Sequence, residues 1–217
     1  LKVYGVLVGK KPLIFTNNDS AYETAIEFKK NNINPIILDT RKNPDSEVIS
    51  EAKNMGIEIK FSYVVVAAKG YKKVNSAEIA NISEDKKDLG EIENIACDCI
   101  CVSGFWTPTI HLASQSGNKT KFNEEIDAFV PGKSKQNETT VGSANGIFSL
   151  EKTLTTAFEK GHEISKKLTN KDNKISIPQT SEKKFTQHDK FWCVPLPKNK
   201  KYPIASSLLN ARSNNIQ

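Results

Sequence analysis

Residues 12–28, PLIFTNNDSAYETAIEF, decide the fold of this chain. The apolar run at 13–15 predicts a short buried strand, and a polar turn follows it. Ser20, with Glu23 three residues later, predicts a capping box at the start of a helix with one apolar side. A strand, a turn and a helix N-terminus with free N–H groups form the opening unit of a nucleotide-binding βαβ fold.

The turn between this strand and this helix lacks the usual glycines. Residues 16–21, TNNDSA, stand where Gly-x-Gly-x-x-Gly would let the backbone approach a pyrophosphate. Asp19 would in addition repel the phosphates. Two interpretations are open for Asn17, Asn18 and Asp19: they line a nucleotide pocket, or they serve only as turn and cap residues.

A second buried strand, residues 35–39, ends in an acid. In dinucleotide-binding folds an acid at this place can bond a ribose hydroxyl, and Asp39 has about the right spacing. A solvated strand end is the alternative interpretation. Arg41, two residues later, could bind a phosphate or pair with Asp39.

Apolar residues alternate further along the chain and predict more strands. A third strand is expected at 57–61, and a β-meander at 63–82 with a glycine turn. Residues 95–102 predict the best core strand. Later, an apolar periodicity predicts a helix from Phe148 to Leu168.

Three of the four cysteines fall in the strand expected at 95–102. On one strand Cys97, Cys99 and Cys101 would all face the same side. We expect reduced thiols, because neighbours two apart on a strand are poorly placed for a disulfide. The sequence predicts no metal site, since no Cys or His pair at a ligand spacing lies nearby.

These patterns predict an α/β fold in two parts. Residues 1–168 are expected to form an incomplete Rossmann-like domain with the meander inserted after the third strand. This arrangement resembles FAD/NAD(P)-binding domains of the pyridine nucleotide-disulfide oxidoreductase type. Residues 169–217 are expected to form a linker or loosely structured C-terminal tail, partly disordered, because polar residues dominate there with little periodicity.

Composition excludes several classes of protein. The net charge is +6, but between Lys166 and Lys201 ten lysines face three acids, so the folded part is close to neutral. We therefore expect no nucleic-acid partner. No apolar run approaches the ~20 residues of a membrane helix, and no signal peptide is visible, so we expect a cytoplasmic protein without membrane contact. The chain begins at Leu1 and its only methionine is Met55, which indicates a piece of a longer polypeptide.

Five segments of the chain form a set in a fixed order, namely FTNNDSAY (15–22), LDTR (38–41), CDCICVSGFWTPTIHLASQSG (97–117), FVPG (129–132) and VGSANGIF (141–148). Among them, FTNNDSAY and the stretch SGFWTPTIHLASQ are long and unusual. Together the five segments resemble the alpha subunit of heterotetrameric sarcosine oxidase, from about Tyr4 to Leu168 and again, more weakly, through 188–195. The resemblance implies an internal fragment, the second dinucleotide-fold domain with the return to the first. Residues 199–217 depart from the family.

The resemblance implies a multisubunit, flavin-dependent amine oxidoreductase. Its family oxidises sarcosine to glycine with O2 and tetrahydrofolate, and gives H2O2 and methylenetetrahydrofolate. It implies NAD in the full alpha subunit, FMN and FAD in the complex, tetrahydrofolate in a further domain, and beta, gamma and delta subunits as partners. The fragment alone would be inactive and would contribute nucleotide binding and subunit placement. Two alternatives stay open: an alpha-type subunit of N-methylglutamate dehydrogenase or opine oxidase, and a non-catalytic, degenerate dinucleotide-fold scaffold.

The resemblance also implies where a nucleotide lies. SGFWTP (103–108) is similar to a segment of disulfide-reductase-like flavoproteins in which glycine lets the chain pass close to a dinucleotide. VGS (141–143) stands where those proteins carry Gly-Asp, and serine in place of the acid suits a nucleotide other than FAD. A tight turn and helix N-cap is the alternative there. No catalytic residue is identified, and the candidate cofactor-binding residues are Ser103, Gly104, Pro108, Gly142, Ser143, Ala144, Asn18, Asp19 and Asp39.

Overall fold

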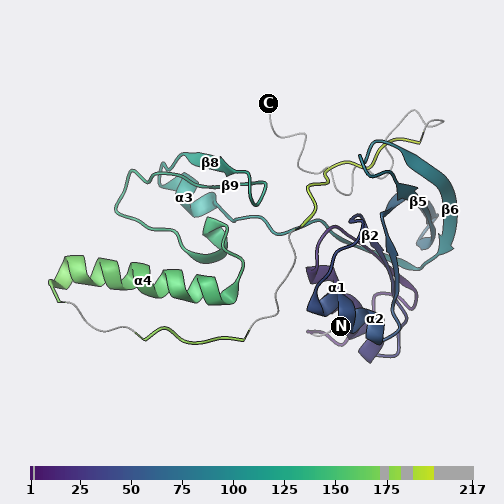
Figure 1. Cartoon of the computed structure of the whole chain (residues 1–217), viewed down its shortest axis with the longest axis horizontal. Coiled ribbons are helices and arrows are strands. Elements are labelled where there is room, and N and C mark those ends of the chain that lie inside the picture. The colour runs from purple at the N-terminus through teal and green to yellow at the C-terminus, as the bar shows by residue number, and fades with distance from the viewer. Residues whose placement is uncertain (2, 172–175, 182–187, 198–217) are drawn as a thin grey trace. The chain divides into compact units, whose positions relative to one another are not determined.

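The computed structural model describes residues 1, 3–171, 176–181 and 188–197, and these fall into two units (Figure 1). Unit 1 contains the described residues of Leu1–Phe105 together with 188–197, and unit 2 contains those of Trp106–Lys183. Much of the predicted tail, including the stretch 199–217, lies outside the described residues.

A parallel sheet forms the centre of unit 1. Among the described residues its strand order is β3-β2-β1-β7. The strands are β1 (Pro12–Thr16), β2 (Ile36–Asp39), β3 (Glu58–Phe61) and β7 (Cys99–Ser103). PLIFT and IILD are continuous apolar runs because a parallel sheet is covered on both faces. The predicted α/β fold with a parallel sheet is confirmed.

The register of this sheet brings three strand ends together. Thr16, the last residue of β1, pairs with Asp39 on one side and with Ser103 on the other. β2 and β3 lie on one side of β1 and β7 lies on the other, so the strand order reverses at β1. Ligands of open α/β sheets bind at such a switch point, at the carboxyl ends of the strands.

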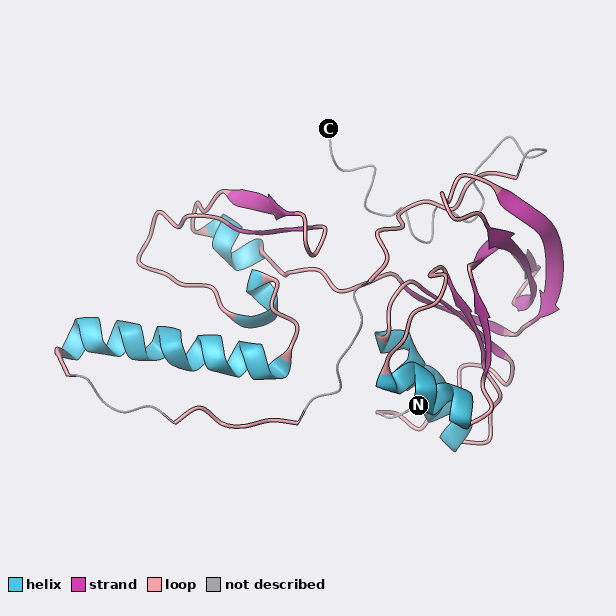
Figure 2. Ribbon diagram, viewed as in Figure 1, coloured by secondary structure: helices cyan, strands magenta, loops and turns pink. Residues whose placement is uncertain are grey.

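Two helices cover one face of the parallel sheet (Figure 2). They are α1 (Ser20–Lys30) and α2 (Glu47–Asn54). Their buried residues Ala25, Ile26 and Ile49 pack in one cluster with Ile14 of β1 and Ile37 of β2. The apolar side expected for the first helix is therefore the side that faces the sheet.

The predicted β-meander covers the other face. It consists of the antiparallel strands β4 (Tyr63–Gly70), β5 (Val74–Ile82) and β6 (Leu89–Ala96). Val64, Val65 and Ile79 of the meander pack in one cluster with Leu13 and Leu38 of the parallel sheet. The third strand of the meander, β6, was not expected from the sequence.

The prediction of one strand at 95–102 is wrong. Cys97 and Asp98 lie outside regular structure and separate β6 from β7. The Asp98 carboxylate accepts hydrogen bonds from the backbone N–H groups of Lys10 and Lys11, at 2.8 and 2.7 Å. Cys97 is consequently buried in the core between sheet and meander, while Cys101 packs toward the helices. The expectation that all three thiols share one side is wrong for Cys97.

Residues 188–197, here called the returning segment, belong to unit 1 although they follow unit 2 in the chain. Phe191 and Val194 are buried in the core cluster of the meander. Phe105, next to the end of β7, stacks on His188 with ring centroids 4.5 Å apart and meets Trp192 edge to face at 4.8 Å. Side chains far apart in sequence therefore complete the core of unit 1.

Unit 2 is built from short elements and one long helix. They are α3 (His111–Gln115), β8 (Thr120–Asn123), β9 (Ala128–Pro131), the 3-10 turn η1 (Gly142–Asn145) and α4 (Leu150–Thr169). α4 confirms the helix expected at 148–168, and the Ser149 side chain caps it by accepting from the Lys152 N–H. None of the helices in the described ranges has the length and apolarity to cross a membrane.

Candidate functional site

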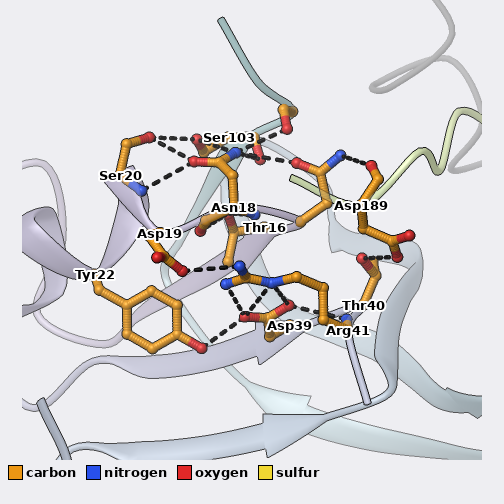
Figure 3. A network of polar contacts seen from close by, with 12 residues as sticks. Thr16, Asn18, Asp19, Ser20, Tyr22, Asp39, Thr40, Arg41, Ser103 and Asp189 are labelled. Carbon is orange, nitrogen blue, oxygen red and sulfur yellow. Dashed lines mark hydrogen bonds and ion pairs between the residues drawn. The ribbon is translucent and has the colours of Figure 1, made fainter. Parts of the chain in front are cut away.

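Polar side chains gather at the carboxyl edge of the parallel sheet in unit 1 (Figure 3). They come from the turn between β1 and α1, from the ends of β2 and β7, and from the returning segment. The residues of the β1–α1 turn and of the end of β2 are at most 8% exposed. They are Thr16, Asn17, Asn18, Asp19, Asp39, Thr40 and Arg41. Burial at this density requires that each polar group has partners.

The Arg41 guanidinium lies between two buried carboxylates. Its Nη1 lies 2.8 Å from Asp19 Oδ1, its Nη2 lies 2.7 Å from Asp39 Oδ2, and its Nε donates to Asp39 Oδ1 at 3.0 Å. The Tyr22 hydroxyl donates to Asp39 Oδ2 at 2.7 Å. Of the two roles that the sequence left open for Arg41, pairing with Asp39 is the one observed. Both oxygens of Asp39 are engaged by the chain itself.

Tyr22 and Arg41 keep their protons near neutral pH. Burial first, and then the charge of Asp39, raises the pKa of Tyr22, so the phenol stays a neutral donor. Burial alone would lower the pKa of Arg41, but its hydrogen bond to Asp39 and the charges of Asp39 and Asp19 raise it. Neither group exchanges a proton near neutral pH, so neither suits general acid–base catalysis.

Asn18 joins the turn after β1 to the end of β7. Its Oδ1 accepts from the backbone N–H of Ser20 at 3.0 Å and from the Ser20 hydroxyl at 2.6 Å. Its Nδ2 donates to the Gly104 carbonyl at 2.8 Å and to the Ser103 carbonyl at 3.2 Å. The predicted capping box is wrong: Ser20 is already helical, the N-cap residue Asp19 makes no side-chain cap bond, and Asn18 satisfies the helix end.

We expect Asn18→Asp to lower the free energy of unfolding by about 1–3 kcal/mol, because aspartate keeps the acceptor but places an oxygen against two carbonyls. Thermal unfolding followed by circular dichroism measures the change. Asn31→Asp is the matched control, since the Asn31 amide bonds only to the Glu27 carbonyl in an exposed place. Equal losses in the two variants would contradict the role given to Asn18.

Asp189 of the returning segment binds residues that follow β1 and β2 at the carboxyl edge of the sheet. Its backbone N–H donates to the Asn17 carbonyl at 2.9 Å, and its own carbonyl accepts from Asn17 Nδ2 at 2.9 Å. Its carboxylate accepts from the Thr40 hydroxyl at 3.1 Å and pairs with Lys86. The sequence analysis missed Asp189 and Tyr22, and the only signal for Asp189 was the weak family resemblance through 188–195.

The candidate cofactor-binding residues fall into two groups. Asn18, Asp19, Asp39, Ser103 and Gly104 come together at the carboxyl edge in unit 1. The others lie in unit 2, namely Pro108, Gly142, Ser143 and Ala144.

The turn at residues 142–146 in unit 2 depends on glycine. Gly142 has φ +67° and Gly146 has φ +81°, which only glycine adopts without strain. A Cβ added to Gly142 would lie 2.9 Å from Thr153 Cγ2, and one added to Gly146 would lie 2.6 Å from Ile126 Cδ1. The turn therefore packs closely against α4 and against Ile126, with Pro108 at an ordinary contact distance of 3.7 Å from the added Cβ of Gly146.

Curated relatives share long stretches with this chain. It is 29% identical over 163 residues to sarcosine oxidase subunit alpha of Corynebacterium sp. (strain P-1), which covers 74% of this chain and 17% of that subunit. The chain is related to sarcosine oxidase alpha subunits. Subunit alpha of Rhizobium meliloti (strain 1021) is 33% identical over 146 residues, covering 66% of this chain and 14% of that subunit. The resemblance read from the motifs is confirmed, and the chain spans less than a fifth of the relatives' length.

No protein-family model matches the present chain. Among solved structures, the flavoprotein disulfide reductase RclA of Escherichia coli is 12% identical with a TM-score of 0.49, covering 75% of this chain and 36% of that one. Thioredoxin reductase of T. acidophilum is 17% identical with a TM-score of 0.45, covering 63% and 48%. At these scores the sheet order of unit 1 is the better guide to its fold.

Proposed function

We propose that this chain is part of the alpha subunit of a sarcosine oxidase-type flavoenzyme, in which it contributes nucleotide binding and subunit placement. The relationship to curated alpha subunits carries the proposal. In the proposed reaction the N-methyl group of sarcosine gives up two electrons, and O2 takes them with two protons to form H2O2. The methyl carbon passes to tetrahydrofolate as methylenetetrahydrofolate, and glycine remains.

The proposed assembly contains beta, gamma and delta subunits beside the alpha subunit. It would hold NAD in the alpha subunit, FMN and FAD in the complex, and tetrahydrofolate in a domain beyond these residues. The chain alone is proposed to be inactive, and the complete enzyme to work in the cytoplasm. An alpha-type subunit of N-methylglutamate dehydrogenase or opine oxidase is the alternative enzyme. Assays of the complete complex with each amine as substrate would separate these.

We place NAD at the turn 142–144 in unit 2 rather than at the edge of unit 1. The turn consists of small residues and precedes the 20-residue helix α4, and small residues let a nucleotide approach the backbone. In unit 1 a ribose at Asp39 would have to displace both Arg41 and Tyr22. For Asn18, Asp19 and Asp39 these contacts favour the structural alternative.

Calorimetric titration of NAD tests this placement, on the polypeptide made from the full open reading frame that contains these residues. We expect Gly142→Val to weaken NAD binding at least about tenfold, or about 1.4 kcal/mol, because its Cβ meets Thr153 and its φ is strained. Ser143→Ala removes only a hydroxyl and should weaken binding less. Gly161→Ala is the matched control, since a Cβ at Gly161 meets nothing within 4 Å.

A non-catalytic scaffold is the second candidate function, and the filled edge of unit 1 favours it. NAD binding that is absent, or equally strong in Gly142→Val and Gly161→Ala, would overturn the placement and support the scaffold. Binding lost only on Arg41 substitution would instead locate the nucleotide in unit 1.

A further inference from the structure

Two thiols lie side by side on β7, the outer strand of the parallel sheet next to β1. Cys99 and Cys101 are two residues apart on the strand, and their Sγ atoms are 3.7 Å apart. Both side chains are half-buried, and both thiols are free. Among the described residues β7 pairs only with β1, so it is an outer strand of the sheet. The pair plays no part in the polar cluster or in the proposed nucleotide site.

The spacing of the two sulfurs suits a bridging atom better than a disulfide. A disulfide requires ~2.05 Å between sulfurs, and two strand positions put the Cα atoms at roughly the upper limit of the allowed range. The ladder with β1, which pairs Pro12 with Cys99 and Ile14 with Cys101, resists the movement needed. With sulfur–ligand bonds of ~2.3 Å, the 3.7 Å separation corresponds to an angle of about 107° at the bridging atom.

Only two sulfurs are available at this site, and this number limits which atom could bridge them. A structural zinc ion takes four ligands, but no group of three or more His, Cys, Asp or Glu side chains within the described ranges is placed to hold a metal ion. Cys97, the nearest thiol in sequence, is buried on the other side of the sheet. A soft, pyramidal centre that brings its own third substituent needs only two sulfurs.

We propose that Cys99 and Cys101 form a dithiol site that takes a monosubstituted trivalent arsenical across both sulfurs. In the binding step two arsenic–sulfur bonds form and the arsenic–oxygen double bond breaks. The oxide oxygen leaves as water with the two thiol protons. Arsenic stays trivalent, so the step needs neither an oxidant nor a reductant.

The surroundings of Cys101 disfavour its reaction as a single thiol with alkylating reagents. Burial, followed by the neighbouring Cys99, raises the pKa of the Cys101 thiol to about 12. Alkylating reagents attack the thiolate, so Cys101 is a poor target for them near neutral pH. Cys193 is exposed and serves as the reference thiol within the same chain.

Phenylarsine oxide and intact-mass spectrometry of the reduced, folded 217-residue chain test the proposal. We expect one phenylarsenic group per chain, removed again by ethanedithiol. Cys99→Ser and Cys101→Ser should each abolish the adduct, while Cys193→Ser should keep it. Circular dichroism checks that each variant is folded.

A second measurement uses the unmodified sequence and so does not depend on the folding of variants. The chain is treated with phenylarsine oxide, then alkylated with iodoacetamide after unfolding, and the peptides are mapped. Protection of Cys99 and Cys101 with full alkylation of Cys193 supports the proposal. An adduct that maps to Cys193, that survives both serine substitutions, or that forms only with the unfolded chain would overturn it.

Discussion

Replacing Arg41 by methionine is expected to lower the free energy of unfolding of unit 1 by about 3–5 kcal/mol. The guanidinium is buried between Asp19 and Asp39, whose side chains are fully buried. Methionine fills a similar volume but leaves two carboxylates facing each other without a cation. Taking one partner from a buried ion pair costs more than the pair itself contributes, because the remaining charge has lost its solvent.

Urea unfolding followed by tryptophan fluorescence measures this loss. The chain has two tryptophans, and Trp106, which is 65% exposed, can be replaced by phenylalanine. Trp192, packed against Phe105, then reports unit 1. Lys42→Met is the matched control: this neighbouring lysine pairs with Glu84, but the side chains are 73% and 78% exposed, so we expect a change within about 1 kcal/mol.

A second substitution sharpens this test. In the Arg41→Met background, Asp19→Asn removes one of the stranded charges and should regain part of the lost stability. In the unmodified chain the same change should be destabilising. Such a reversal of sign is the mark of direct coupling. Additive effects, or equal losses in Arg41→Met and Lys42→Met, would contradict the buried ion cluster.

Phe191→Ala is expected to cost about 3–5 kcal/mol in the free energy of unfolding of unit 1. Phe191 is 6% exposed and packs in the core between the meander and the parallel sheet. Its removal leaves a cavity and also loosens the segment that carries Asp189. The Trp192 fluorescence of the Trp106→Phe background again measures the change.

Leu196→Ala is the matched control for Phe191, since it removes an apolar side chain from the same segment at a place that is 44% exposed. We expect it to cost less than about 1 kcal/mol. A small loss in both variants would mean that the returning segment adds little to unit 1. Limited proteolysis gives an independent measure, because a loosened segment is cleaved faster.

Local patterns predicted much of the fold. Continuous apolar runs marked β1 and β2, and alternation marked the first two strands of the meander. The division between β6 and β7 escaped prediction, because it depends on Asp98 binding the backbone of Lys10 and Lys11, some 87 residues earlier. The capping box failed for a related reason: Asn18 competes with Ser20 for the helix end, and it is held by carbonyls after β7.

The candidate site was predicted in part. Asn18, Asp19 and Asp39 were chosen from the strand–turn–helix pattern, and the structure brings them to one edge with Ser103 and Gly104. The pattern left open whether Arg41 pairs with Asp39, and it gave no sign of the Tyr22 contact, since which partner a buried acid finds depends on packing. The contact of Asp189 with Asn17 could not be predicted from local patterns, because the two residues are 172 positions apart in the chain.

The placement of residues 188–197 in unit 1 has a consequence for biosynthesis. A ribosome adds roughly 5–20 residues per second, so Asp189 is made about 10–30 s after its partner Asn17. During that interval the apolar surface of the meander lacks Phe191 and Val194. The part of unit 1 that precedes unit 2 in the chain therefore stays incompletely closed until unit 2 has been translated.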